Sequence, residues 1–319
     1  MGKIISILAL FSDHLFEFIC FVRYSSSYSL NSSTKLQGRI TFNYHSLEKG
    51  LINVPIMSRF GKAKISRLMN YLKLWVVRGY DVNNSQFRSG CAVLKKYFDY
   101  HAETGQEIND IISDNEIEFF SRYSEGQEGG TISFNCKDYF SSSHSGFNEF
   151  SVSRHSVRHF SAESIDYTTI KRVISLAGNA PSVCNRQGWQ VTFITRKSLV
   201  DEVLLIQSGL NSTSESVKQL LVVTVNRGVF VSVTEWYQVF IDGGIFVQNL
   251  LYALHFHEIA AVALNWSKHY FLDKKLRKLI GLDPSEKVIS VIAIGYPIEE
   301  FSVPRSKRKD VSEILKIID

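Results

Sequence analysis

Two arginines near the middle of the chain have the spacing of a phosphate clamp. Arg154 and Arg158 lie four residues apart, with His155 and Ser156 between them. A guanidinium group presents paired N–H donors that match two phosphate oxygens, so these arginines could bind a phosphate bidentately. A surface salt-bridge cluster is the alternative interpretation.

A second polar segment follows at the end of a helical pattern. It contains Pro181, Ser182, Asn185 and Gln187, whose hydroxyl and amide groups could hydrogen-bond a polyol or the edge of a heteroaromatic ring. Proline and asparagine also favour ordinary turns, and a plain turn is the alternative. Together the two segments predict a site for both ends of a nucleotide-like cofactor.

Three further motifs follow in order along the C-terminal half. They are Asp242-Gly243-Gly244 running on to Leu251, then Leu264-Asn265-Trp266, then Ile294-Gly295-Tyr296-Pro297. The order of all five motifs, over roughly residues 150–319, resembles the flavin-dependent nitroreductase family. The resemblance implies an α+β fold with a mixed sheet, an FMN held at a homodimer interface, and NAD(P)H as the usual reductant.

The resemblance also implies roles for single residues. The arginine segment would contact the FMN phosphate and ribityl chain, and the proline-led turn would lie beside the isoalloxazine ring. Backbone amides near Ala261 would face the flavin, and Arg308, with Arg305 as second choice, would return to the phosphate from a run that could otherwise be solvated. The expected cofactor residues are Arg154, His155, Ser156, Arg158, Pro181, Ser182, Asn185, Gln187, Ala261 and Arg308.

Two positions depart from the pattern of that family. Gly188 stands where many relatives have proline, and we expect it to loosen the turn. Ala260-Ala261 stands where relatives often show Gly-Leu-Gly, and a methyl group at Ala261 would narrow the approach to the flavin. The flavin itself carries the hydride chemistry, so no catalytic side chain is assigned.

The apolar periodicity of the C-terminal half predicts alternating helices and strands. Helix-period stripes precede Pro181, span residues 236–256 and reappear in a basic helix at 268–280. Strand patterns cover residues 189–193, 220–225 and 288–294. This order favours a nitroreductase-like mixed sheet flanked by helices, in an α+β fold.

The first half of the chain has a different character. Residues 62–80 and 92–101 show helical stripes, so residues 1–149 are expected to form a mainly helical region ahead of an FMN-binding domain at 150–319. A Ser-, Gly-, Glu- and Asn-rich stretch at 123–149 predicts an exposed linker. The Leu-Glu-Lys-Gly segment at 47–50 resembles nitroreductase-like proteins associated with bacterial surface-polysaccharide biosynthesis.

The first 24 residues predict a helix with one apolar face. Asp13, His14 and Glu17 interrupt the apolar run, so the segment is expected to be too short and broken to span a bilayer. No convincing cleavage site for a signal peptide follows it. We expect it to pack on the protein, with peripheral membrane contact as the alternative.

The composition bears on the class of protein and on which ligands it could bind. Hydrophobic residues at 45% and charged residues at 21% are ordinary for a soluble protein, and the expected location is cytoplasmic. The four cysteines show no metal or disulfide spacing, and Cys184 is expected to fill space. His45, Glu48 and His101 also lack the spacing of a metal site. The net charge is +5, and the basic run at 305–309 has no aromatic platform, so nucleic-acid binding is not expected.

Two functions remain in view. The first is an FMN-dependent oxidoreductase that passes a hydride from NAD(P)H through flavin to a small oxidised substrate, in surface-polysaccharide biosynthesis. The alternative is a non-catalytic accessory protein with the flavin fold, which docks a membrane or glycan-assembly partner through its N-terminal half.

Overall fold

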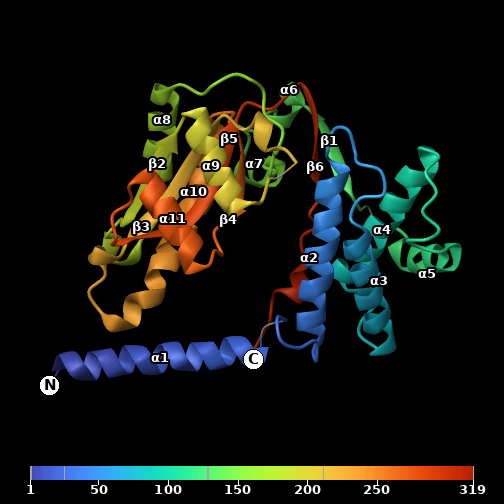
Figure 1. The fold of residues 1–319 in the computed structure, drawn as a ribbon, viewed down its shortest axis with the longest axis horizontal. Helices are drawn as coiled ribbons and strands as arrows, with labels where there is room; N and C mark the ends of the chain where they lie inside the picture. Colours follow the sequence, from blue (N-terminus) through green and yellow to red (C-terminus); the bar gives the residue numbers. More distant parts are fainter. Residues whose placement is uncertain (1, 25, 128, 211, 319) are drawn as a thin grey trace. The chain divides into compact units, whose positions relative to one another are not determined.

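The chain forms two compact units in the computed structural model, which describes residues 2–24, 26–127, 129–210 and 212–318 (Figure 1). The sheet unit contains residues 1–10 and 133–301, and the helical unit contains residues 11–132 and 302–319. The division falls inside helix α1 (Gly2–Tyr24) and inside the paired strands β1 (Thr131–Asn135) and β6 (Glu300–Pro304). The domain boundary expected after residue 149 stays a prediction.

A four-stranded sheet forms the centre of the sheet unit. Its order is β2 (Trp189–Ile194), β3 (Gln219–Asn226), β5 (Glu286–Gly295) and β4 (Ala260–Asn265), with antiparallel neighbours. The apolar runs of β3 and β5 are almost entirely buried, which explains their central place. A parallel bridge between Ser156 and Ala261 makes the sheet mixed. The predicted α+β fold is confirmed.

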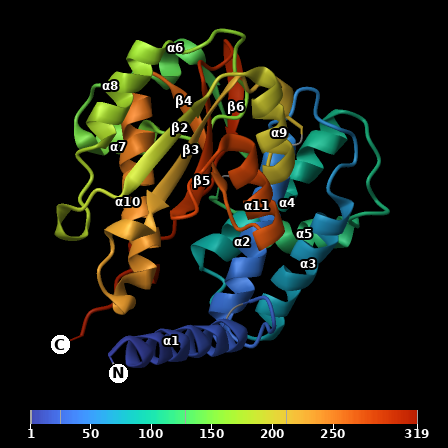
Figure 2. The same ribbon diagram turned by 60° about the vertical axis from the view of Figure 1, so that its left-hand side comes forward.

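Helix α10 (Gln238–Phe256) packs on this sheet and on α8 (Tyr167–Ala177), as Figure 2 shows. Phe246 of α10 is fully buried, and its ring stacks on Trp189 at 4.9 Å between centroids. A Cβ on Gly243 would lie 2.6 Å from Ile289 Cγ1, so glycine permits the close approach of α10 to β5. The remaining helices of this unit are α6 (Cys136–Tyr139), α7 (Phe147–Ser153), α9 (Lys197–Gln207) and α11 (Tyr270–Ile280).

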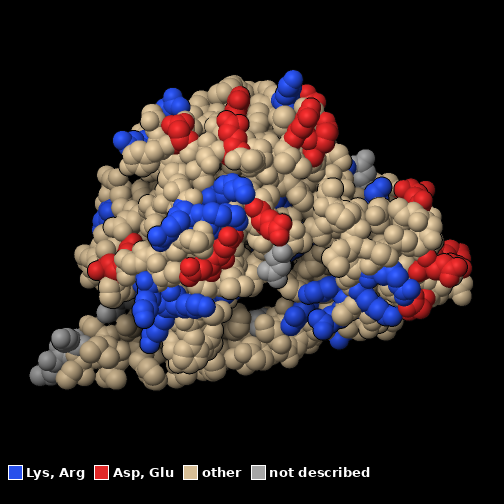
Figure 3. All heavy atoms as spheres, turned by 45° about the horizontal axis from the view of Figure 1, so that its top comes forward, with Lys and Arg blue, Asp and Glu red and all other residues tan. Residues whose placement is uncertain are grey.

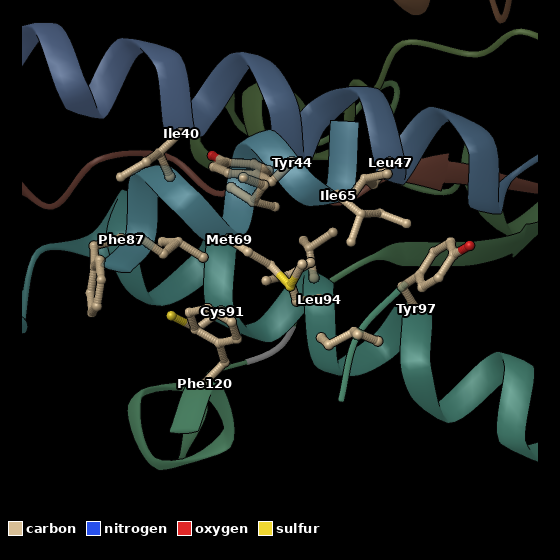
Figure 4. Close-up of a cluster of buried hydrophobic side chains, with 14 of the residues drawn as sticks. Ile40, Tyr44, Leu47, Ile65, Met69, Phe87, Cys91, Leu94, Tyr97 and Phe120 are labelled. Carbon is tan, nitrogen blue, oxygen red and sulfur yellow. The ribbon is translucent and has the colours of Figure 1, made fainter. Parts of the chain in front are cut away.

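The helical unit is built around a separate apolar core, shown in Figure 4. Helices α2 (Ser33–Leu51), α3 (Lys62–Val77), α4 (Ser85–Glu103) and α5 (Asp114–Ser124) surround it. The side chains of Ile40, Leu68 and Phe87 in this core are fully buried. The expectation of a mainly helical N-terminal region is confirmed.

Helix α1 corrects two expectations about the first residues. It is unbroken over 23 residues, and the window Ile4–Tyr24 has a mean hydropathy of 1.8, so by length and composition it could cross a membrane. The expectation that it is too short and broken to do so was wrong because Asp13 and Glu17 do not end the helix. No described side chain in that window is buried, contrary to the expected packing on the protein.

The stretch at 123–149 is ordered rather than an exposed linker. It contains the end of α5, strand β1, helix α6 and the start of α7. Strand β1 pairs with β6, which lies far away in the sequence. Serine and glycine content therefore predicted a loop where a non-local strand partner decides the structure.

Candidate functional site

The arginine segment lies in extended form beside strand β4. Ser156 bridges Ala261 in parallel register, and the Val157 backbone N–H donates to the Ala261 carbonyl at 3.1 Å. Alternation along an extended chain places Arg154, Ser156 and Arg158 on one face, while Val157 points to the opposite side and is fully buried. The structure thus joins two predicted site segments that lie about 100 residues apart in the sequence.

Neighbouring groups fix the backbone and side chains of this segment. The Tyr139 hydroxyl donates to the His155 carbonyl and accepts from the His155 backbone N–H, both at 3.0 Å. Arg158 is only 9% exposed, and its guanidinium donates to the Ser156 carbonyl at 2.9 Å. A cation held in such low-dielectric surroundings attracts an anion more strongly than a solvated one.

A buried histidine supports the segment from the end of α10. His255 Nε2 lies 2.8 Å from Ser153 Oγ, one residue before Arg154. Burial lowers the pKa of His255 to about 4, helped by the charges of Arg154 and His155. His255 is therefore neutral near pH 7. It lies in the last turn of α10, whose C-cap residue is His257.

The proline-led turn follows α8 and is held in an uncommon backbone form. Cys184, Asn185 and Gln187 have φ values of 47°, 55° and 49°. Left-handed backbone costs a non-glycine residue about 1–2 kcal/mol, and such residues cluster at functional sites. Within the turn, Ser182 Oγ accepts from the Gln187 N–H at 3.0 Å, and Gln187 Nε2 donates to Asn185 Oδ1 at 3.0 Å.

Helix α10 holds this turn and the end of α8 that precedes it. The buried Asp242 carboxylate accepts from the Val183 N–H at 3.3 Å and from Gln238 Nε2 at 2.7 Å. Seven residues later, Asn249 Nδ2 donates to the Ala177 carbonyl at 2.8 Å. Both residues belong to recognised sequence motifs, but periodicity gave no sign of this role. A carboxylate inside an apolar helix was the available signal.

An ion pair secures the far side of the turn. Arg186 donates to both carboxylate oxygens of Glu235, at 2.6 and 3.1 Å. The hydrogen bonds from Arg186 lower the pKa of Glu235 to about 2. The 3-10 helix that carries Glu235, Val233–Tyr237, lies just before α10. Side-chain contacts thus hold Ala177, just before the turn, and Val183 and Arg186 within it.

Two expectations about the turn are corrected. Gly188 is buried, and a Cβ there would lie 2.7 Å from Val229 Cγ2, so glycine tightens the packing rather than loosening the turn. Cys184 is exposed, so it does not fill space in a core. Its thiol stands at the left-handed bend instead.

Arg308 lies in a different unit from the other predicted cofactor residues. Arg308 belongs to the helical unit, where its guanidinium donates to the Ser306 carbonyl at 3.0 Å, while the nine other predicted residues belong to the sheet unit. The role of Arg308 in binding the phosphate stays a prediction.

The histidines considered as metal ligands have other neighbours. His45 Nδ1 lies 3.2 Å from Glu48, and His101 is buried with Nδ1 2.8 Å from the Tyr97 carbonyl. Among the described residues, no group of three His, Cys, Asp or Glu side chains could hold a metal ion.

Comparisons with known proteins agree on one part of the chain. Residues 152–296 match the model of the nitroreductase family. Iodotyrosine deiodinase of Hydra vulgaris is 28% identical over 202 residues, covering 53% of this chain and 72% of that protein.

Solved structures resemble about half of the chain. The nitroreductase family protein of Streptococcus pneumoniae TIGR4 is 18% identical with a TM-score of 0.47, covering 54% of this chain and all (100%) of that one. A Desulfovibrio desulfuricans protein assigned as a nitroreductase, in complex with FMN, is 21% identical with a TM-score of 0.46, covering 54% and 96% of the two chains.

Proposed function

We propose that this chain, whose residues 152–296 match the model of the nitroreductase family, works as an FMN-dependent oxidoreductase. In this proposal a hydride passes from NAD(P)H through the flavin to a small oxidised acceptor. The observation that carries it is the bridge between Ser156 and Ala261, which brings the arginine segment to the edge of the sheet.

The side chains present fit the chemistry of FMN. Its phosphate needs cationic donors, and Arg154 and Arg158 share one face of an extended segment with the Ser156 hydroxyl between them. Its ring edge needs hydrogen-bonding groups, and the exposed turn presents Asn185 and Gln187. FMN, when bound, would supply hydride acceptance and donation.

The residues of the chain then have the task of positioning. Arg154 and Arg158 would neutralise the phosphate, and His255 adds no charge of its own because it stays neutral near pH 7. Asp242 fixes the turn by accepting from the Val183 N–H. Holding the ring edge and the phosphate on rigid elements limits the motion of the bound group.

A second copy of this chain is the partner we propose. Helix α10 exposes Phe240, Ile241 and Ile245 on one face, although it is otherwise a core helix. Gly244 lies among them, and a Cβ there would meet nothing within 4 Å. An apolar face with an exposed glycine lets another helix approach closely, which suits a homodimer interface.

The biological setting rests on the sequence resemblance of residues 47–50. We place the acceptor in surface-polysaccharide biosynthesis and the domain in the cytoplasm. The second candidate function, an accessory protein that docks a membrane or glycan-assembly partner through its N-terminal half, is favoured by the exposed helix α1.

The first test is the colour of the protein. Purified protein should be yellow with bound FMN and should bleach anaerobically with NADH or NADPH, assayed separately. The pair Arg154→Ala/Arg158→Ala should lose FMN, whereas Arg196→Ala, an exposed arginine of the same unit, should retain it. A colourless protein that binds no added FMN would refute the proposal.

Acceptors then separate the two candidates. Reoxidation of the reduced protein should be followed with a quinone, a nitroaromatic compound and iodotyrosine, the last because of the deiodinase relative. Turnover with any of them supports the enzyme. Retained flavin without reduction by either nicotinamide nucleotide supports the accessory protein.

A further inference from the structure

Helix α1 exposes many large apolar side chains. Its side chains are exposed by up to 66%, at Ile4 and Phe11, and by 48% at Leu15. In Figure 3 the visible face of its described part, at the lower left, is tan, the colour of uncharged residues. A contiguous apolar surface of this kind marks an interaction site. The large apolar residues are Ile4, Ile5, Ile7, Leu8, Phe11, Leu15, Phe18, Ile19 and Phe21.

Most polar residues of α1 lie on one side of the helix, apart from Ser12 and Arg23. Ser6, Asp13 and Glu17 are spaced by seven and four residues, and successive residues turn by about 100°, so the three lie on the same side. Apolar side chains occupy most of the remaining circumference. A protein groove usually covers a single stripe of a helix, whereas lipid can surround a wider apolar surface.

We propose that α1 lies in the plane of a lipid membrane, with its apolar side chains among the acyl chains and Asp13 and Glu17 turned to water. An in-plane position is favoured over a spanning one because Asp13 is the central residue of Gly2–Tyr24. A spanning helix would place this carboxylate at the middle of the bilayer, where charged groups are costly.

The inner end of α1 is fixed to the helical unit. Lys35 of α2 is 7% exposed, and its ammonium donates to the Arg23 carbonyl at 2.7 Å and to Ser29 Oγ at 2.6 Å. Arg39 donates to the Ser26 carbonyl through Nε and Nη2, at 2.9 and 2.6 Å. Cations at helix-terminal carbonyls also complement the helix dipole. A membrane-bound α1 would therefore hold α2 at the lipid surface.

The charges of α1 identify the kind of lipid contact. Its acidic residues, Asp13 and Glu17, are balanced by Lys3 and Arg23. Binding would depend on apolar insertion rather than on anionic lipid, so neutral vesicles should suffice and salt should matter little. Arg23 and Tyr24 at the inner end suit the headgroup level.

The test is flotation of the full-length protein with phosphatidylcholine vesicles. The wild type should float at low and high salt, and a sodium carbonate wash at high pH should release it, as expected for an in-plane helix. The pair Phe11→Ser/Phe18→Ser should lower the partition coefficient by at least about tenfold. The control pair Met57→Ser/Val77→Ser removes equally exposed apolar side chains from the helical unit and should leave flotation unchanged.

Each other outcome overturns the proposal. Protein that stays in the aqueous phase has no lipid-binding helix, and protein that resists carbonate has a spanning helix. A purified chain whose intact mass lacks the first residues has a cleaved leader instead. Lipid contact does not require FMN, so loss of flotation with retained yellow colour separates this inference from the proposed enzymatic function.

Discussion

Two helices of this protein have similar lengths and apolar compositions but opposite surroundings. The window Ile4–Tyr24 covers 21 residues with a mean hydropathy of 1.8 and is not buried, whereas Thr234–Phe256 covers 23 residues with a mean hydropathy of 1.3 and is half buried. Helix α10, inside the second window, carries Asp242 and Asn249 toward neighbouring backbone. Asp13 and Glu17 instead share one side of the exposed helix α1.

The difference shows that apolar composition alone does not decide whether a helix is buried in the core or exposed. An apolar helix becomes a core element when its polar groups find partners and its glycine admits a strand, as Asp242 and Gly243 do. When the large apolar side chains of such a helix are exposed, as in α1, the same composition leaves surface to be covered from outside.

Removing one ring from each helix should separate them most clearly. Phe246→Ala leaves a cavity beside Trp189 and should lower the free energy of unfolding of the sheet unit by about 3–5 kcal/mol. Phe11→Ala should change it by less than about 0.5 kcal/mol. Hydrogen exchange of the β3 amides measures both values, and equal losses would remove the contrast between the two helices.

Acid should destabilise the protein through the end of α10. His255 has a folded-state pKa of about 4, below that of an unfolded histidine. Between pH 6.5 and 4 the unfolded state binds more protons, so stability is full above that range and falls as the pH is lowered, by up to about 3 kcal/mol. His255→Gln should flatten this dependence in urea titrations, while His14→Gln on α1 should not. An unchanged slope in the first variant would count against the buried neutral histidine.

The turn beside α10 should loosen when its carboxylate is removed. Asp242→Ala leaves the Val183 N–H without its acceptor and should cost about 1–3 kcal/mol locally. Asp242→Asn keeps an oxygen acceptor and should lose less. Exchange of the Val183 amide reports the opening, and weaker FMN binding should accompany it. If the Val183 amide exchanged as slowly in Asp242→Ala as in the wild type, this carboxylate would be excluded as the support of the turn.

Two adjacent glycines of α10 should respond in opposite directions. Gly244→Ala adds a methyl group in open space, so the single chain should gain about 0.5–1 kcal/mol of helix stability while self-association weakens. Gly243→Ala would place its Cβ 2.6 Å from Ile289 Cγ1 and should destabilise the chain itself. Sedimentation velocity checks the association. Dimerisation that is untouched by Gly244→Ala would move the interface elsewhere.

Local signals in the sequence predicted the regular elements well. The strands at 189–193, 220–225 and 288–294 correspond to β2, β3 and β5, and the basic helix ends at Gly281, whose φ is 68°. These elements follow from alternation, apolar runs and a left-handed cap, all of which act over a few residues.

Non-local partners explain what the sequence did not reveal. Strand β1 depends on β6, and the bridge from Ser156 to Ala261 depends on a chain segment about 100 residues away. The support of the turn by Asp242 and Glu235 also requires α10 to lie beside it. The candidate site residues were recognisable as motifs, but the groups that hold them were not.

The most direct test of the central claim compares FMN with riboflavin, which lacks the phosphate. Titrating apoprotein with each should give much tighter binding of FMN in the wild type, because Arg154 and Arg158 bind the phosphate. The pair Arg154→Ala/Arg158→Ala should bind both compounds with similar, weak affinity. A variant that still prefers FMN as strongly as the wild type would contradict the assignment of the phosphate to these arginines.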